Sequence, residues 1–175
     1  AGQARRLAFQ PGSATTSSVD SPLPVPVLAV DQYGNVAAGS PAMDVEVRLT
    51  GTQVGGAGRL SLSNGEGTAS VTSQRPQTVE LSFLDTYNTN LDVSATRALT
   101  FSVGAATKVA MAVPASTNVG SPVSVDLTSL DQYGNEVPSS ASITVRVTGA
   151  ATVSNSGIAT LSGGRASIVL RSTKA

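Results

Sequence analysis

The sequence has no cysteine and no histidine, and only 3% of its 175 residues are aromatic. Without cysteine the chain forms no disulfide and no thiolate metal site. Without histidine it lacks the commonest general base and metal ligand, which excludes Ser-His-Asp and Cys-His arrangements for catalysis. Any core must therefore be built mainly from Val, Leu, Ile and Ala.

Charge is also scarce. Charged residues make up 13% of the chain, and eleven basic residues balance eleven acidic ones. Scattered cations give no basic face of the kind that binds nucleic acid. No acidic pair stands at a glycosidase spacing, and no helical pattern follows the glycine-rich stretch Gln53–Gly58, as a phosphate loop would require. We therefore expect no enzyme active site.

Long apolar runs are absent too. No run approaches the ~20 residues that a membrane-spanning helix needs, so we expect no membrane insertion. The first residues, Ala1–Arg6, lack the apolar stretch of a signal peptide, which favours a piece from within a longer chain. At 40% apolar residues, the chain is nevertheless too apolar to be disordered.

What the chain does contain is a repeat. The pentapeptide DQYGN occurs at residues 31–35 and again at 131–135, and Val45–Gly51 matches Ile143–Gly149 at an offset of 98. One unit thus spans about a hundred residues, as repeat architectures do when loop lengths drift slightly. The repeat predicts two domains, 1–103 and 104–175. The second has no counterpart of the first domain's last two predicted strands.

Within both copies, apolar residues alternate with polar ones, which is the period of a β-strand with one buried face. The positions that stay apolar in both copies, and that we expect to point inward, are Leu23, Val25, Val27, Val45, Val47 and Leu49 in the first copy and Val123, Val125, Leu127, Ile143, Val145 and Val147 in the second.

The first domain contains seven such segments, separated by turn signals. We place its strands near 5–10, 23–31, 43–50, 59–63, 67–73, 78–84 and 97–103, and its long loops at 11–20 and 85–96. Seven short strands in about a hundred residues are typical of an immunoglobulin-like sandwich. The predicted fold is all-β: two tandem immunoglobulin-like β-sandwiches, the second lacking its last two strands. Pro24 and Pro26 remove two ladder donors, so that part of its strand should pair on one side only.

Two segments resemble a known family. The run Val25–Asn35 and the run Gly58–Val71 are similar to the signatures of bacterial immunoglobulin-like repeats of the invasin and intimin type. The resemblance implies tandem domains of exported or surface proteins, at the cell surface or outside the cell, that act as stalks, spacers or adhesive modules. It carries over no shared catalytic site.

The repeated pentapeptide has two interpretations. In the structural one, the aspartate accepts hydrogen bonds from backbone N–H groups, and Gly34 and Gly134 supply a positive φ for a tight turn. In the other, Asp31 and Asn35, or Asp131 and Asn135, bind calcium, although calcium takes about 6–8 oxygen ligands. Calcium is the one cofactor that we consider.

Sandwich topology places the second pentapeptide at the pole where its own domain begins. We therefore predict that Asp131, Tyr133 and Asn135 help to set the junction with the first domain. A separate recognition loop is predicted at 84–91, at the same pole as residues 31–35, where Asp85, Tyr87, Asn88 and Asn90 offer hydrogen bonds and a ring for a sugar or protein.

These features favour a spacer that projects other domains of the same bacterial polypeptide. Two alternatives stay open. One is a carbohydrate- or receptor-binding adhesin that uses residues 31–35 and 85–91 on a cell-surface protein or glycan. The other is a subunit of a surface fibre, because a sheet with an unpaired edge invites a donated strand. The second domain's two missing strands either lie outside the sequence given or come from elsewhere.

Overall fold

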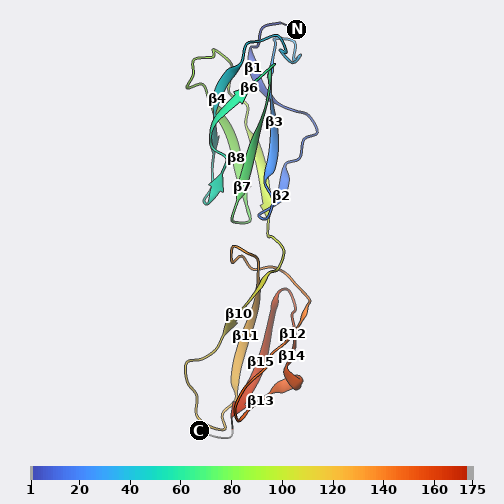
Figure 1. The fold of residues 1–175 in the computed structure, drawn as a ribbon, viewed down its shortest axis with the longest axis vertical. Helices are drawn as coiled ribbons and strands as arrows, with labels where there is room; N and C mark the ends of the chain where they lie inside the picture. Colours follow the sequence, from blue (N-terminus) through green and yellow to red (C-terminus); the bar gives the residue numbers. More distant parts are fainter. Residues whose placement is uncertain (1, 173–175) are drawn as a thin grey trace. The chain divides into compact units, whose positions relative to one another are not determined.

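The computed structural model describes residues 2–172, and the chain forms two compact units, Ala1–Ser102 (unit 1) and Val103–Ala175 (unit 2). Both are built from β-strands (Figure 1). The one helical segment among the described residues is a short turn in unit 2, η1 (Ser154–Gly157). None of residues 2–172 belongs to a helix with the length and apolar character needed to span a membrane.

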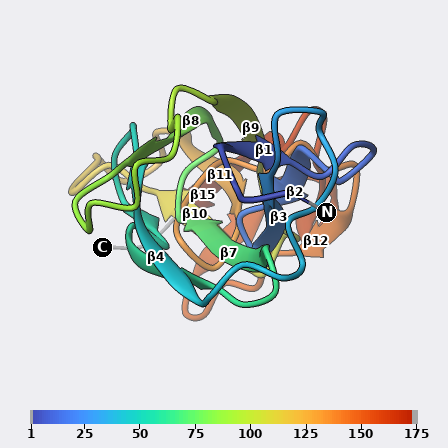
Figure 2. The same ribbon diagram turned by 90° about the horizontal axis from the view of Figure 1, so that it is seen from above.

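Unit 1 consists of two sheets that face each other. The first has the order β1-β3-β7-β5 and the second the order β2-β9-β8-β4-β6, with every pair antiparallel except β2 and β9. Figure 2 looks along the strands and shows β8 and β9 across the unit from β7. The strands are β1 (Arg6–Phe9), β2 (Thr16–Ser18), β3 (Leu23–Val30), β4 (Met43–Leu49), β5 (Val54–Gly55), β6 (Gly58–Leu62), β7 (Glu66–Ser73), β8 (Gln77–Leu84) and β9 (Arg97–Ser102).

All seven strands predicted for the first domain are present, with ends that differ by a residue or so. The prediction was wrong for residues 11–20, which contain strand β2 instead of being loop throughout. Thr16–Ser18 shows no apolar alternation that would have marked it as a strand. It is ordered by parallel pairing with β9, where Thr16 lies opposite Thr100. The adjoining Val19 is buried in the core.

The prolines of β3 pair as predicted. Residues 23–26 pair only with β7, because β1 ends opposite Val27. The N–H of Gln10 still donates to the carbonyl of Pro26 at 3.1 Å. A residue's N–H and C=O point to the same side of a strand, so the donors that Pro24 and Pro26 lack would face the side where β1 has ended.

Alternating residues of both sheets fill the core of unit 1. Val25, Val27 and Val45 are fully buried, as the repeat predicted, and Val47 is 2% exposed. Burying each such side chain contributes about 1.5–3 kcal/mol. The last two strands supply five of the eighteen buried residues of this core, namely Val79, Leu81 and Phe83 of β8 with Leu99 and Phe101 of β9.

Unit 2 repeats part of this plan. Its sheets have the orders β10-β11-β15-β13 and β12-β14, which match β1-β3-β7-β5 and β4-β6 of unit 1. The region 103–172 contains no strand equivalent to β2, β8 or β9, so the predicted lack of the last two strands is confirmed. The strands are β10 (Lys108–Ala112), β11 (Val123–Leu130), β12 (Ser142–Thr144), β13 (Ala151–Val153), β14 (Ile158–Thr160) and β15 (Arg165–Ser172).

The inward positions along β12 are less buried in unit 2 than in unit 1. Ile143 and Val145 pack against the core of unit 2, as the alternation predicted, but they are only half-buried, whereas Val45 and Val47 are buried. Val147 and its counterpart Leu49 are both half-buried. The reason lies in the strands that unit 2 lacks. In unit 1, Val47 pairs with Phe83 of β8, and residues 103–172 provide no such strand.

Candidate functional site

The repeated pentapeptide forms the same tight turn in each unit. In unit 1 it follows the end of β3, where the N–H of Asp31 donates to the carbonyl of Asn35 at 2.9 Å and the N–H of Gly34 to the carbonyl of Asp31 at 3.1 Å. Gly34 has a φ of +87°. Glycine adopts that conformation without the steric cost that a side chain would bring.

The Asp31 carboxylate organises this turn. Its Oδ1 accepts hydrogen bonds from the backbone N–H groups of Tyr33 at 2.9 Å and Asn35 at 3.0 Å. Its Oδ2 accepts one from the backbone N–H of Gly2 at 3.0 Å. The Gly2 hydrogen bond is the largest influence on this carboxyl, and together with those from Asn35 and Tyr33 it lowers the pKa of Asp31 to about 2 against the opposing effect of burial.

Asp131 makes the same set of contacts in unit 2. Its Oδ1 accepts from the backbone N–H groups of Tyr133 and Asn135, both at 2.9 Å, and its Oδ2 from the side-chain amide of Asn135 at 2.8 Å. Oδ2 also accepts from the backbone N–H of Gly104 at 3.2 Å. Burial acts to raise the pKa of Asp131, but the hydrogen bonds from Asn135, Gly104 and Tyr133 outweigh it and lower that pKa.

Each aspartate thus anchors, by a hydrogen bond to a glycine N–H, the segment that precedes the first strand of its own unit. Gly2 and Gly104 stand at an offset of 102, the offset that also relates Leu7 to Val109 in the first strands of the two units. The two glycine partners were not predicted, although their matching positions in the repeat were a signal that could have found them. The pentapeptide DQYGN occurs twice because each unit uses it to build the same turn and the same aspartate–glycine hydrogen bond.

The predicted junction residues have distinct places in this turn. Asp131 is fully buried, and Asn135 holds its carboxylate through backbone and side chain. Tyr133 is 46% exposed, and its backbone N–H donates to Asp131. Their part in the junction between the domains stays a prediction.

The calcium alternative meets a carboxylate that is already engaged. Both carboxylate oxygens of Asp31 accept hydrogen bonds from N–H groups. The partial positive charges of these hydrogens occupy the side of the carboxylate that a cation would need to approach. Within residues 2–172 no group of three or more acidic side chains could hold a metal ion. Calcium binding stays a prediction.

Hydrogen bonds within the predicted recognition loop hold its conformation. Asp85 accepts the backbone N–H of Thr89 at 2.8 Å through Oδ1 and that of Asn90 at 3.0 Å through Oδ2. The Thr89 hydrogen bond is the main cause that lowers the pKa of Asp85. Asn88 and Asn90 adopt left-handed conformations with φ of 56° and 59°, which asparagine tolerates better than most residues.

Tyr87 leaves part of its ring available. Its side chain is 44% exposed, and the guanidinium of Arg59 lies 5.9 Å from the ring centroid. A cation at that distance over a tyrosine face is attracted by the ring quadrupole. The sequence predicted this tyrosine as a contact residue but gave no signal for Arg59.

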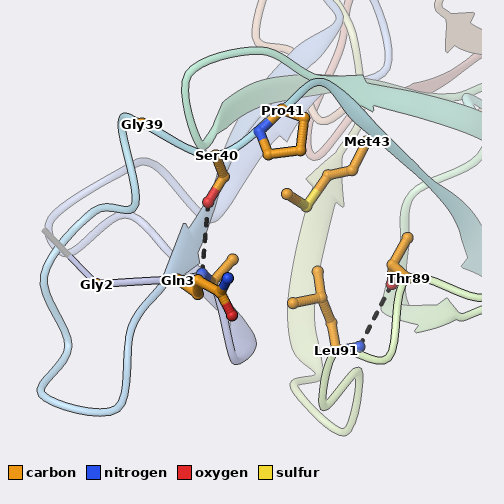
Figure 3. Close-up of a pocket in the computed structure, with 9 residues that line it drawn as sticks. Gly2, Gln3, Gly39, Ser40, Pro41, Met43, Thr89 and Leu91 are labelled. Atoms are coloured by element: carbon orange, nitrogen blue, oxygen red, sulfur yellow. Dashed lines mark hydrogen bonds between the residues drawn. The ribbon is translucent and has the colours of Figure 1, made fainter.

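A cavity of about 370 Å³ lies beside this loop. Figure 3 shows it between the N-terminal segment, residues 39–43 and the loop residues Thr89 and Leu91. Met43 and Leu91 form an apolar wall, and none of the charged side chains among residues 2–172 lines the space. Since Gly2 borders the cavity and also bonds to Asp31, the loops 31–35 and 85–91 lie at the same end of unit 1.

No protein-family model and no curated protein matches the sequence. Among solved structures, the chain is similar to the Escherichia coli adhesin FdeC, with a TM-score of 0.50 and 16% identity over 97% of this chain and 57% of that chain. It is also similar to the D0-D1 domain of Intimin, with a TM-score of 0.41 and 16% identity over 98% of this chain and 86% of that one.

The chain therefore spans 57% of the FdeC structure that it matches. At 16% identity the likeness concerns the fold alone. It agrees with the two facing sheets of unit 1. The resemblance inferred from the sequence is confirmed at this level: the chain has the fold of bacterial immunoglobulin-like domains in tandem.

Proposed function

We propose that the chain is a structural spacer module of a larger bacterial protein at the cell surface or outside the cell. Its partners would be the neighbouring domains of the same polypeptide. The observation that carries this proposal is the fastening of Gly104 by Asp131. Strand β9 ends at Ser102, so Val103 alone separates it from an anchored residue. A connection of that length restricts rotation between two domains far more than a flexible linker does.

Two further observations support the proposal. The anchor is built identically at the start of unit 1, where Asp31 holds Gly2, so the same device would serve a preceding domain. The similar FdeC structure is described as an adhesin, which is a setting where domains must be held away from a surface. Stiffness at each connection is what converts a string of domains into a stalk.

The proposal is tested by measuring the spread of distances between the two units. Because the chain has no cysteine, exposed positions such as Ser70 and Ser162 can be changed to cysteine and spin-labelled without competing sites. Pulsed electron resonance should then give a narrow distance distribution. Asp131→Asn keeps an oxygen for the turn but replaces the acceptor of the Gly104 N–H with an amide, so the distribution should broaden.

Asp31→Asn is the matched control, because it makes the same change in the same motif away from the connection. Its distance distribution should stay narrow. A broad distribution in the labelled chain that keeps Asp131, or an equally narrow one in Asp131→Asn, would show that the anchor does not stiffen the connection.

A second candidate function is adhesion through the end of unit 1. It is favoured by Tyr33, which is 80% exposed, and by Tyr87 on the neighbouring loop. Exposed tyrosine rings stack on sugars and proteins at little entropic cost. A glycan array should show binding that Tyr33→Ala and Tyr87→Ala abolish and that Tyr133→Ala leaves intact. Equal loss in all three variants, or no bound glycan or surface protein, would reject this candidate.

A further inference from the structure

Two segments of unit 1 that are far apart in the sequence run side by side in the same direction. We call residues 5–19, which contain β1 and β2, the leading segment, and residues 92–102, which end in β9, the trailing segment. Figure 1 shows the chain passing into unit 1 beside β1 and leaving it at the opposite end, beside β2. The two segments are thus the parts of the unit that a pull on its chain reaches first.

A backbone bridge holds the beginning of this contact. The N–H of Leu7 donates to the carbonyl of Asp92, and the N–H of Asp92 donates to the carbonyl of Arg5, both at 2.9 Å. The bridge between Arg6 and Asp92 is parallel. Because the side chain of Leu7 is buried in the core, the bridge cannot slide without moving an apolar side chain through close-packed surroundings.

Strands β2 and β9 hold the end of the contact. They are the one parallel pair among the strands of residues 2–102. The N–H of Thr100 donates to the carbonyl of Thr15 at 2.8 Å, and the N–H of Val19 donates to that of Ser102 at 3.0 Å. Val19 and Phe101 are both buried, so each of the two segments is also fixed by a side chain in the core.

Arg97 spans the gap between these two sets of backbone hydrogen bonds. Residues 10–15 belong to no strand, and here a side chain takes over from the backbone. The guanidinium of Arg97 donates to the hydroxyl of Ser13 at 2.6 Å and to its carbonyl at 3.3 Å, and it lies 5.2 Å from the centroid of the Phe9 ring. Ser13 and Arg97 are 84 residues apart, the separation of the paired residues in β2 and β9, so this contact continues the register of that pair.

The shared direction of the two segments determines how the contact responds to tension. Tension along the polypeptide pulls the leading segment towards one end of the unit and the trailing segment towards the other. Since the strands are parallel, they are pulled past each other along their length, and the hydrogen bonds between them are strained together. In an antiparallel pair pulled at its open end, the bonds break one after another. Forced unfolding depends on the unfolding rate, which is slower when several bonds must break at once.

We propose that unit 1 has a mechanical function: the parallel contact between the leading and trailing segments is a clamp that keeps the unit folded when its chain is pulled at the two ends. The inference rests on the spacer function proposed above for the source of the tension, since a spacer transmits the force that acts on the domains it holds. The clamp consists of backbone groups at both ends of the contact, with Arg97 between them.

The test pulls on unit 1 of the 175-residue chain in two directions by single-molecule force spectroscopy. Since the chain has no cysteine, attachment points can be introduced at exposed positions. Gln3→Cys with Ser102→Cys gives the shear direction, which strains the clamp. Pro76→Cys with Ser102→Cys gives the opening direction, which separates β8 and β9 from the end where Gln77 pairs with Phe101. At one loading rate, the unfolding force should be at least about twofold higher in the shear direction. Equal forces would overturn the proposal.

Ser17→Pro tests the backbone part of the clamp. Thr15 and Val19 both bond to β9, and successive residues of a strand face opposite sides, so the N–H of Ser17 also faces β9 and proline removes it. At constant force in the shear direction, the lifetime of folded unit 1 should fall at least about tenfold, whereas the lifetime in the opening direction should change little. Thr16→Pro is the matched control, because the N–H of Thr16 faces away from β9, and it should leave both lifetimes close to their original values.

Arg97→Ala should likewise shorten the lifetime in the shear direction alone, with Arg48→Ala on the outward side of β4 as its control. This variant and the comparison of directions keep the proposal testable if Ser17→Pro does not fold. Lifetimes that fall equally in both directions would show a general loss of stability and would contradict a clamp. The spin-label distances, measured without tension, test the spacer function separately: a flexible connection with a direction-dependent unfolding force rejects the spacer and leaves the clamp standing.

Discussion

Units 1 and 2 agree in their turns and differ in their interiors. Gly34 and Gly134 have φ of +87° and +89°. The N–H of Ala29 donates to Gly65 at 2.7 Å, and the equivalent N–H of Ser129 donates to Gly164 at 2.8 Å. The bonds from Ala29 and Ser129 join β3 and β11 to the turns that precede β7 and β15, which are strands of the same sheet. The local network therefore forms whether or not the second sheet is complete.

Burial behaves differently. Eighteen buried residues form the core cluster of unit 1 and five that of unit 2, counted over the described residues. Val47 and Val145 have the same side chain and equivalent places, yet only Val47 is buried. The alternation along a strand determines which way a side chain points, whereas the opposing sheet determines whether that side chain is shielded from water.

The largest expected effect comes from damaging the part that only unit 1 has. Leu81 on β8 is fully buried, and Leu81→Ala should destabilise unit 1 by about 3–5 kcal/mol through lost burial and a cavity. Unit 2 should keep its own unfolding midpoint. Urea denaturation followed by NMR signals of each unit measures the two separately. A loss below about 1 kcal/mol, or an equal loss in unit 2, would contradict an independent core.

The next prediction compares equivalent positions directly. Val47→Ala should cost unit 1 about 2–3 kcal/mol, because it removes two buried methyl groups and leaves a void. Val145→Ala should cost unit 2 less than about 1 kcal/mol, because the side chain is already partly in water. The same denaturation experiment measures both. If the two losses are equal, Val145 is as buried in solution as Val47.

The strands and their inward faces could be predicted from the sequence because period-two alternation is local and appears in both copies. Strand β2 could not, since Thr16–Ser18 is ordered by pairing with a strand more than eighty residues away. The exposure of Val145 could not be read from its own segment either. The exposure of Val145 depends on whether counterparts of β8 and β9 cover it, and the residues around Val145 carry no information about those strands.

The aspartates of the candidate site were predictable as acceptors of backbone N–H groups, because an aspartate after a strand and before glycine suits a tight turn. Their bonds to Gly2 and Gly104 were not predicted. Both partners lie more than twenty-five residues upstream and donate through the backbone, so no side-chain type marks them. Only their matching place in the two copies does.

Acid should weaken unit 1 through Asp31. Its pKa in the folded protein is about 2, below the ordinary value of 3.8, so the folded state favours the ionised form. The stabilisation is therefore complete above about pH 5 and is lost progressively as the pH falls through 3.8 and then through the folded-state pKa of about 2. Thermal unfolding at pH 5, 3.5 and 2.5 should show a falling midpoint for unit 1.

Asp31→Asn removes the titrating group, so its midpoint should fall less over the same range. Asp131→Asn should reduce the acid sensitivity of unit 2 in the same direction, because its pKa is also lowered. A variant that loses as much stability in acid as the unmodified chain would show that the anchor carboxylate does not carry this linkage.

The smallest effect should come from the ion pairs on the surfaces of the two units. Arg165 pairs with Glu136 in unit 2, and Arg59 with Asp44 at 2.6 Å in unit 1. Both arginine side chains are largely in water, where hydration and salt offset most of the attraction. Arg165→Gln should shift the melting temperature of unit 2 by about 2 °C or less.

Arg59→Gln should lower the melting temperature of unit 1 by more, because Arg59 also lies over the Tyr87 ring and shares Asp44 with Ser61. Melting curves at low and high salt measure both, and a larger loss for Arg165→Gln would reverse this ranking and give unit 2 an electrostatic support that unit 1 does not need.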